Sequence, residues 1–197
     1  MTHSYDAELK LFINGSWRTG EGRDEHAVVN PATGAAIAGL PLATPADLEE
    51  ALTASAQGFA IWSKTDVEAR GAILRKAASL IRDRAEHLTT LLTTEQGKPL
   101  AEARTEVLSC AAQFDYFAEE AKRSYGRVLV RPTGQRALVL KQPVGPVAAF
   151  SPWNFPVNLM CKKMAAALAA GCSIIAKPPE ETPACTSAIM QCVIDGG

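Results

Sequence analysis

Residues 144–177 read VGPVAAFSPWNFPVNLMCKKMAAALAAGCSIIAK, and this stretch decides the fold. Val144–Phe150 is a short apolar run of the kind that forms a buried strand. Pro156–Ala170 is alanine-rich and is closed by Gly171, which predicts a helix with a glycine just past its carboxyl end. Ser173–Lys177 is a second apolar run that predicts another buried strand. Strand, helix and strand in this order predict a right-handed crossover between two parallel neighbours.

Helices are predicted on both sides of this unit. Downstream, Thr182-Pro183 opens a helix that reaches about Ile194. Upstream, Thr44 caps a helix that has Pro45 in its first turn. One face of that upstream helix is formed by Leu48, Ala51, Leu52, Ser55 and Phe59.

Two longer helices are predicted next. The first starts at a capping box made by Thr65 and Glu68 and runs to Gly97. Its apolar stripe has the spacing of a buried helix face and comprises Ile73, Leu74, Ala77, Leu80, Ile81, Leu88, Leu91 and Leu92. The second covers about Ala101–Tyr125 and stops at Gly126.

Short strands are expected elsewhere. Leu11–Pro41 is rich in turn signals, and Val128–Val130 with Ala137–Leu140 forms a ribbon around a Pro-Thr-Gly turn. The pattern predicts an α/β fold around a parallel sheet, in three segments: residues 1–126, 127–143 and 144–197. Because only two sheet strands are present and two strands cannot cover both faces and edges, we expect the fold to be incomplete.

Composition argues against nucleic acids and membranes as partners. Hydrophobic residues make up 47% of the 197 residues, charged residues 21%, and the formal net charge is −1. Met1–Lys10 lacks the basic start and apolar run of a secretory signal, and Met164–Ala176 is too short to span a bilayer. We therefore expect a cytoplasmic protein.

The cysteines predict no metal site. Their number is odd and none forms a C-x-x-C pair. In a chain without an export signal, reduced and buried thiols are the expected state. The five are Cys110, Cys161, Cys172, Cys185 and Cys192.

Two loops are candidates for ligand binding, because open parallel sheets bind ligands beyond the carboxyl ends of their strands. They are Ser151–Pro156 and Lys177–Glu180. The amide of Asn154 can donate to a developing oxyanion, or it can cap the following helix, which is the commoner use of an asparagine there. Lys177 and Glu180 can bind ribose hydroxyls, although exposed loop side chains of this kind usually bind nothing.

The quoted loops carry a family resemblance. FSPWNFP at Phe150–Pro156, followed by AAALAAGCSIIAKPPEETP at Ala165–Pro183, resembles the cofactor cleft of the aldehyde dehydrogenase superfamily. Upstream segments agree in order and spacing: FINGSW at 12–17, VNPATG at 29–34, TEQGKPLAEA at 94–103 and FDYFAEEAKRSYG at 114–126. The resemblance implies a Rossmann-like cofactor-binding domain, here incomplete, with an oligomerisation hairpin at 127–143.

The resemblance also implies roles for single residues. Asn154 would be the side-chain half of the oxyanion hole for a cysteine thiohemiacetal. Ser151, Pro152 and Trp153 would line the nicotinamide side of the cofactor groove. Lys177 and Glu180 would hold the adenosine ribose. A carboxylate there repels a 2′-phosphate, so NAD is expected in preference to NADP.

The implied substrate is an aldehyde. The segments at 94–103 and 118–126 look most like the succinate-semialdehyde dehydrogenase branch. That branch has an arginine-lysine pair after PWNFP, whereas this chain has Lys162-Lys163, and a lysine lacks the bidentate fork of arginine. We therefore give equal weight to two alternatives for Lys162: a contact with the substrate, and an ordinary solvated lysine on the helix surface. Succinate semialdehyde, another acidic semialdehyde and a different aldehyde all remain open.

The sequence leaves three hypotheses for the function of the whole chain. The first is an oxidoreductase whose catalytic cysteine and general-base glutamate, and with them its catalytic domain, lie outside these residues. The second is a short non-catalytic protein that binds nucleotide or a full-length subunit. The third is an acylating aldehyde dehydrogenase. In the family the hairpin pairs with a neighbouring subunit, so a homodimer or homotetramer is expected of the intact enzyme.

Overall fold

The computed structural model describes residues 5–197. Residues 1–4 lie outside it; they belong to the predicted segment 1–126 and to Met1–Lys10, the stretch that lacks the features of a secretory signal. Four short strands come first: β1 (Leu11–Ile13), β2 (Ser16–Arg18), β3 (Glu25–Val29) and β4 (Ala36–Pro41). They form two antiparallel pairs, β1 with β2 and β3 with β4. This confirms the prediction of strands and turns for Leu11–Pro41.

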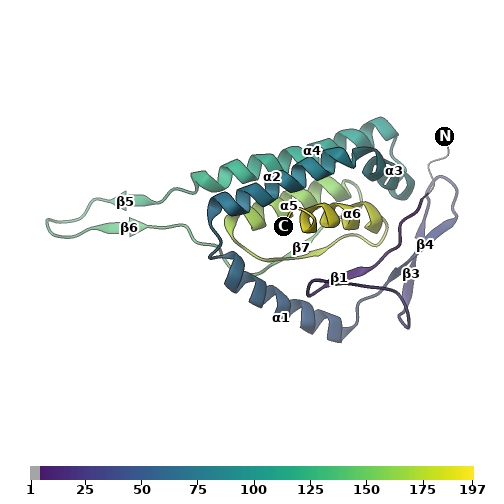
Figure 1. The fold of residues 1–197 in the computed structure, drawn as a ribbon, viewed down its shortest axis with the longest axis horizontal. Coiled ribbons are helices and arrows are strands. Elements are labelled where there is room, and N and C mark those ends of the chain that lie inside the picture. The colour runs from purple at the N-terminus through teal and green to yellow at the C-terminus, as the bar shows by residue number, and fades with distance from the viewer. Residues whose placement is uncertain (1–4) are drawn as a thin grey trace.

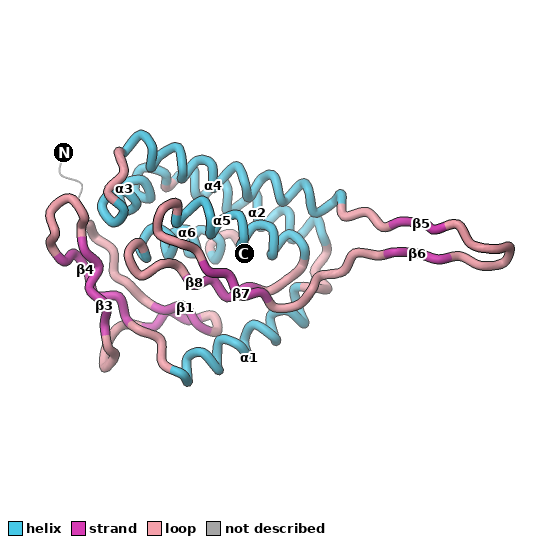
Figure 2. The backbone as a smooth tube through the Cα atoms, turned by 180° about the vertical axis from the view of Figure 1, so that it is seen from behind, coloured by secondary structure: helices cyan, strands magenta, loops and turns pink. Residues whose placement is uncertain are grey.

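Helices make up most of the body (Figure 1). They are α1 (Pro45–Trp62), α2 (Val67–Asp83), α3 (Ala85–Gln96), α4 (Leu100–Glu120), α5 (Pro156–Ala170) and α6 (Pro183–Ile194), with a 3-10 turn at Ala121–Arg123. Helices α2 to α6 enclose the core, whose largest fully buried side chains are Phe114, Leu74, Ile81, Leu88, Leu91, Leu92, Met160, Met164 and Ile189. Seen from behind, α1 lies on the other side of β7 and β8 from these helices (Figure 2).

The predicted crossover is present. Strand β7 (Val147–Phe150) pairs in parallel with β8 (Ile174–Lys177), and α5 connects them. Gly171 ends α5 in the left-handed conformation, with φ of 90°, as its position predicted. Of β7 only Ala149 is buried, whereas Phe150 is 66% exposed. This run and Ser173–Lys177 are strands, as expected, but the expectation that they are buried was wrong for most of their side chains, since in the two-stranded sheet β8 has no buried residue.

The hairpin projects away from the helices (Figure 1). Its strands β5 (Arg127–Leu129) and β6 (Ala137–Val139) are antiparallel, as predicted. Val130 is 98% exposed, and its neighbours Val128, Leu138 and Leu140 are also exposed. An apolar ribbon with unpaired edges is therefore available for contact with another surface.

The helix predicted from Thr65 to Gly97 is two helices. Asp66, not Thr65, is the cap of α2 and accepts the backbone N–H of Glu68, while Thr65 donates to Ile61 at the end of α1. The helix is interrupted at Arg84, although no glycine or proline at this point disfavours a helix. Both α2 and α3 pack against α4 and α6.

The inward face of α1 is polar. Leu48 and Leu52, expected on an apolar face, are exposed, and the buried residues are Asp47 and Ser55. Asp47 completes a capping box with Thr44 and accepts from Arg23, which holds the pKa of this carboxyl well below its usual range. Hydrogen bonds therefore attach α1 to the strands more than apolar packing does.

Two of the five cysteines are not reduced thiols. A disulfide joins Cys110 on α4 to Cys161 on α5, whereas Cys172, Cys185 and Cys192 are free and buried. The expectation of five reduced thiols was wrong for this pair because α4 and α5 pack together and bring their Cα atoms to 5.6 Å, within the usual range for a disulfide.

Candidate active site at the carboxyl edge of the sheet

Two loops leave the sheet at the same edge. Phe150, the last residue of β7, is the register partner of Lys177, the last residue of β8. Because the strands are parallel, Ser151–Pro156 and Pro178–Thr182 both start at the carboxyl edge. This is the edge at which α/β sheets bind ligands.

The first loop presents polar and aromatic groups. Pro152, Trp153 and Asn154 are exposed, and Trp153 is exposed over half of its surface. Ser151 is buried, and within residues 5–197 its hydroxyl oxygen has no hydrogen-bond partner. A buried hydroxyl without a partner is costly, so it marks a position where a ligand group can complete the bonding.

Asn154 does not cap the helix that follows it. The cap position of α5 is Phe155, which makes no capping side-chain bond. In the part of the chain that the structure describes, no hydrogen bond to the Asn154 side chain is present, so its amide remains available to a ligand. Its role in an oxyanion hole stays a prediction.

The second loop holds an ion pair. Lys177 Nζ donates to Glu180 Oε1 at 2.6 Å, and both side chains are about half exposed. This hydrogen bond is the main reason why the pKa of Glu180 lies below its ordinary value. The structure thus brings together the two residues that the sequence singled out for ribose binding, although their contact with ribose stays a prediction.

A buried carboxylate on α4 caps α5. Glu106 Oε1 accepts the backbone N–H groups of Val157 at 3.1 Å and Asn158 at 3.0 Å. Its second oxygen pairs with Lys98, whose ammonium also lies 4.3 Å from the ring centroid of Phe155. Both charged side chains are almost completely buried. Because Phe155 directly follows Asn154, this pair fixes the end of the first loop against the body of the protein.

A second carboxylate does the same for α6. Glu95, on α3, accepts the backbone N–H groups of Ala184 at 2.8 Å and Cys185 at 3.2 Å, and the hydroxyl of Tyr5 at 2.9 Å. Burial raises its pKa from 4.5 to about 7, against the lowering effect of these hydrogen bonds. Each loop of the edge therefore leads into a helix whose first turn is held by a distant glutamate.

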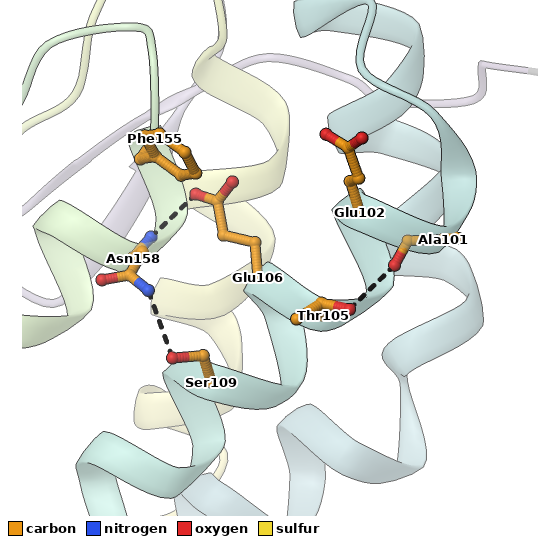
Figure 3. Close-up of a pocket in the computed structure, with 7 residues that line it drawn as sticks. All are labelled: Ala101, Glu102, Thr105, Glu106, Ser109, Phe155 and Asn158. Carbon is orange, nitrogen blue, oxygen red and sulfur yellow. Dashed lines mark hydrogen bonds between the residues drawn. The ribbon is translucent and has the colours of Figure 1, made fainter.

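A pocket of about 420 Å³ lies beside the first loop (Figure 3). It is lined by Ala101, Glu102, Thr105, Glu106, Ser109, Phe155 and Asn158. Asn158 Nδ2 donates to Ser109 Oγ at 3.2 Å across the wall between α5 and α4. Phe155, which follows Asn154 in sequence, thus forms part of a mainly apolar hollow that also exposes the polar side chains of Thr105, Ser109 and Asn158.

Lys162 lies one helical turn beyond Asn158 on α5 and is exposed. Within the described chain it forms no ion pair with a carboxylate, whereas its neighbour Lys163 donates to the carbonyl of Phe150. The two lysines thus differ in their surroundings, and the charge of Lys162 is available to a ligand.

Sequence reasoning missed Glu95, Glu106 and Lys98. One signal was present: both glutamates fall on the buried, mainly apolar faces of their helices, Glu95 one turn after Leu91 and Glu106 one turn before Cys110. A second was that α5 and α6 begin with proline and lack a capping side chain, so their first N–H groups need acceptors from elsewhere.

Among residues 5–197 there is no group of three or more His, Cys, Asp or Glu side chains placed to hold a metal ion. No helix in the same range is both long and apolar enough to cross a membrane.

Comparison with known proteins identifies the family. Residues 17–197 match the model of the aldehyde dehydrogenase family. This chain belongs to the aldehyde dehydrogenase family. The family membership that the motifs suggested is therefore confirmed. The whole chain also superposes on an aldehyde dehydrogenase from Brucella melitensis biovar abortus 2308, with a TM-score of 0.94 and 41% identity. This superposition confirms the α/β fold. The chain covers 42% of that structure.

Curated relatives within the family include enzymes named for acidic compounds. A 4-(hydroxymethyl)benzenesulfonate dehydrogenase of Comamonas testosteroni is 46% identical over 93% of this chain. A succinate semialdehyde dehydrogenase of Acinetobacter baylyi is 39% identical over 95% of it. The chain spans 39% of the length of each of these two relatives.

Proposed function

We propose that the protein containing this chain oxidises an aldehyde to a carboxylic acid with NAD(P), its catalytic cysteine and general-base glutamate lying outside these residues. The observation that carries the proposal is the register pairing of Phe150 with Lys177. It places the loop containing Asn154 and the loop containing Glu180 at one edge of a parallel sheet, and the family membership gives this edge its chemistry.

The residues at the edge fit a dinucleotide. The partnerless hydroxyl of Ser151 and the exposed faces of Pro152 and Trp153 suit the nicotinamide end, and Lys177 with Glu180 suits the hydroxyl groups of a ribose. When bound, the cofactor accepts a hydride from the substrate. The carboxylate of Glu180 favours NAD, because it accepts from a ribose 2′-hydroxyl and repels a 2′-phosphate.

Asn154 acts on the reacting carbonyl. Its amide N–H donates to the oxygen that gains negative charge when a nucleophile adds to the aldehyde. The buried pair of Glu106 and Lys98 holds Phe155 and the first turn of α5, so this donor is supported by a rigid body of protein. A donor held in place before the reaction stabilises the transition state without the cost of reorienting.

The tail of the aldehyde lies in the pocket between α4 and α5. Phe155 supplies an apolar surface, and Thr105, Ser109 and Asn158 supply hydrogen bonds. The charge of Glu106 is already balanced by Lys98 and two backbone amides, whereas Lys162 carries an unpaired positive charge one turn away. Lys162 supports a substrate with an acidic group at its far end, bound toward this lysine and away from the exposed carboxylate of Glu102. Two relatives are named as dehydrogenases of acidic compounds, one of 4-(hydroxymethyl)benzenesulfonate and one of succinate semialdehyde, and these names support the same class of substrate.

Steady-state kinetics on the full-length protein test the proposal. Succinate semialdehyde and 4-formylbenzenesulfonate are compared with the neutral butanal and benzaldehyde, with NAD in excess. We expect kcat/KM to be at least tenfold higher for the acidic member of each pair, equivalent to about 1.4 kcal/mol. In Lys162→Met the difference should shrink, and in Lys162→Arg it should persist. Equal kcat/KM values within both pairs would reject the acidic substrate, and no turnover of any aldehyde would reject the activity.

The hairpin supports self-association of the intact enzyme. Its exposed apolar side chains and free strand edges suit pairing with another subunit, in a homodimer or homotetramer. Sedimentation of the full-length protein and of a Val128→Lys, Leu138→Lys variant tests this, since the variant should sediment as a smaller species while keeping the circular dichroism of the folded protein.

A further inference from the structure

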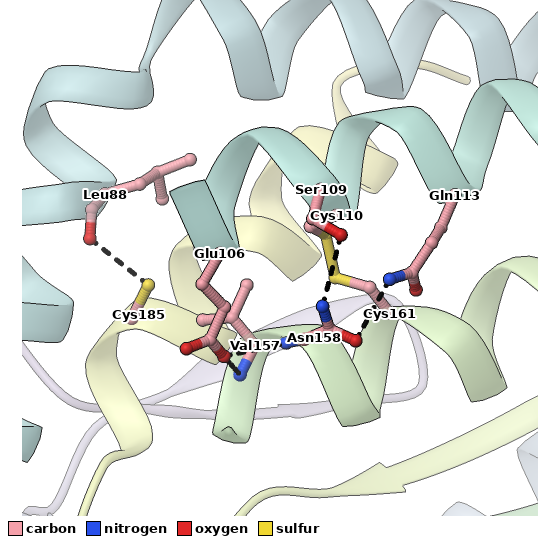
Figure 4. Close-up of a disulfide and its surroundings, with 9 residues drawn as sticks. All are labelled: Leu88, Glu106, Ser109, Cys110, Gln113, Val157, Asn158, Cys161 and Cys185. Carbon is pink, nitrogen blue, oxygen red and sulfur yellow. Dashed lines mark hydrogen bonds between the residues drawn. A yellow bond between two sulfur atoms is a disulfide. The ribbon is translucent and has the colours of Figure 1, made fainter. Parts of the chain in front are cut away.

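The disulfide lies in the contact between α4 and α5 (Figure 4). Cys110 and Cys161 are both completely buried and are separated by 51 residues of chain. A reagent in solution can reach the bond only when the two helices part. The bond therefore holds together elements that belong to different parts of the sequence.

The same helix contact forms a wall of the pocket. Ser109 directly precedes Cys110, and Asn158 lies one turn before Cys161. Asn158 donates to Ser109 at 3.2 Å and accepts from Gln113 at 3.1 Å (Figure 4). These hydrogen bonds and the disulfide join the same turns of α4 and α5, so breaking the disulfide alters the hydrogen bonds as well.

We propose that the Cys110–Cys161 pair is a redox-sensitive clamp on this pocket wall. With the disulfide formed, the α5 turn that carries Asn158 is held against Ser109 on α4. A dithiol reductant breaks the S–S bond: two electrons and two protons convert it to two thiols, and the reductant becomes a disulfide. A small-molecule disulfide of the glutathione class reverses the step and leaves as two thiols.

The other cysteines do not offer an equivalent pair. In the described chain Cys172, Cys185 and Cys192 are free, and the thiol of Cys185 donates to the carbonyl of Leu88. Burial raises the pKa of the Cys185 thiol, which keeps it protonated and unreactive. Redox control through this part of the chain therefore falls on Cys110 and Cys161.

Peptide mapping tests whether the bond exists. Free thiols are alkylated under denaturing conditions before trypsin digestion, without reduction. We expect peptides 105–122 and 142–162 to be linked, and to separate after reduction, while Cys172, Cys185 and Cys192 carry the label. The proposal is overturned if Cys110 and Cys161 are both labelled, even after incubation with oxidised glutathione.

Thermal melting tests the clamp without relying on the proposed activity. Once mapping shows that the bond is broken, the melting temperature of the full-length protein should fall by roughly 2–5 °C, as expected for a cross-link over this separation in a chain of the relatives' length. Cys110→Ala, or Cys161→Ala should the first not fold, should lose this sensitivity to reductant. Cys172→Ala, the matched control, should keep it. An unchanged melting temperature after reduction would overturn the clamp.

Kinetics add a readout that rests on the proposed function. Reduction should raise KM for the aldehyde several-fold and leave kcat within about twofold, because the reacting groups are not moved. Amide exchange in α5 should increase at the same time. If melting responds to reduction and KM does not, the bond is structural only and its effect on the pocket is rejected. A failure of the proposed activity itself would leave the melting and exchange results intact.

Discussion

Glu106 accepts the backbone N–H of Val157 at 3.1 Å, across 51 residues of sequence. The first turn of α5 is thereby held by a carboxylate on α4, and the loop that carries Asn154 ends at this turn. The position of the candidate oxyanion donor thus depends on a buried charge outside the loop.

Asn154→Ala should lower kcat of the full-length enzyme by about 100- to 1,000-fold, the usual cost of removing one oxyanion donor. The affinity for NAD, measured by calorimetry, should change little, because the amide acts on the substrate oxygen. The melting temperature should also stay constant, since Asn154 is exposed. A variant with wild-type kcat would remove Asn154 from the mechanism.

Glu180→Ser should move the cofactor preference toward NADP. Removing the carboxylate ends the repulsion of a 2′-phosphate and leaves Lys177 free to attract it. We expect the ratio of kcat/KM for NAD to that for NADP to fall by roughly tenfold, or about 1.4 kcal/mol. Glu181→Ser, which alters the exposed neighbouring carboxylate, is the matched control and should leave the ratio unchanged.

Glu106→Gln should lower the free energy of unfolding by about 3–5 kcal/mol, because Lys98 is left buried without a counter-charge. Glu102→Gln, one turn earlier on α4 and exposed, should change it by less than about 0.5 kcal/mol. Adding Lys98→Met to Glu106→Gln should recover part of the loss. Denaturant unfolding of wild type, these three variants and Lys98→Met alone measures these values, and a double variant whose loss equals the sum of the two single losses would refute the coupling.

Glu95 should make stability depend on pH in a defined direction. Its pKa is about 7 in the folded chain and 4.5 ordinarily, so between these values the folded chain holds a proton that the unfolded chain has lost. Stability from this group is complete below pH 4.5 and is lost as the pH rises through 7, by roughly 3 kcal/mol in all.

The measurement is the difference in unfolding free energy between wild type and Glu95→Gln from pH 5 to 8. Taking the difference cancels other carboxylates, such as Asp47, whose lowered pKa gives the opposite trend at more acidic pH. The advantage of wild type over the variant should shrink as the pH rises. A difference independent of pH would show that Glu95 does not titrate in this range.

Local signals in the sequence predicted much of the fold. The alanine-rich run closed by Gly171 and the two apolar runs beside it gave β7, α5 and β8 with nearly correct bounds. The break at Arg84 was not predicted, because it follows from packing against α4 and α6 and no residue there disfavours a helix. The exposure of Leu48 and Leu52 was missed for a related reason, since periodicity shows a face but not what covers it.

The candidate site was predicted only in part. Its loops follow from strand order, and Lys177 and Glu180 do lie in contact. The supports on α3 and α4 could not be found by local patterns, because Glu95 and Glu106 act on backbone groups about 90 and 50 residues away. The disulfide was also missed, since pairing of Cys110 with Cys161 depends on the approach of two helices.

The most direct test of the central claim is isotope transfer. An aldehyde labelled with deuterium at its carbonyl carbon is oxidised by the full-length protein with NAD, and the reduced cofactor is analysed by mass spectrometry. We predict one deuterium in the reduced nicotinamide for each molecule of acid formed. Formation of the acid with no deuterium in the cofactor, or no acid at all, would contradict the assignment of this edge to hydride transfer from an aldehyde.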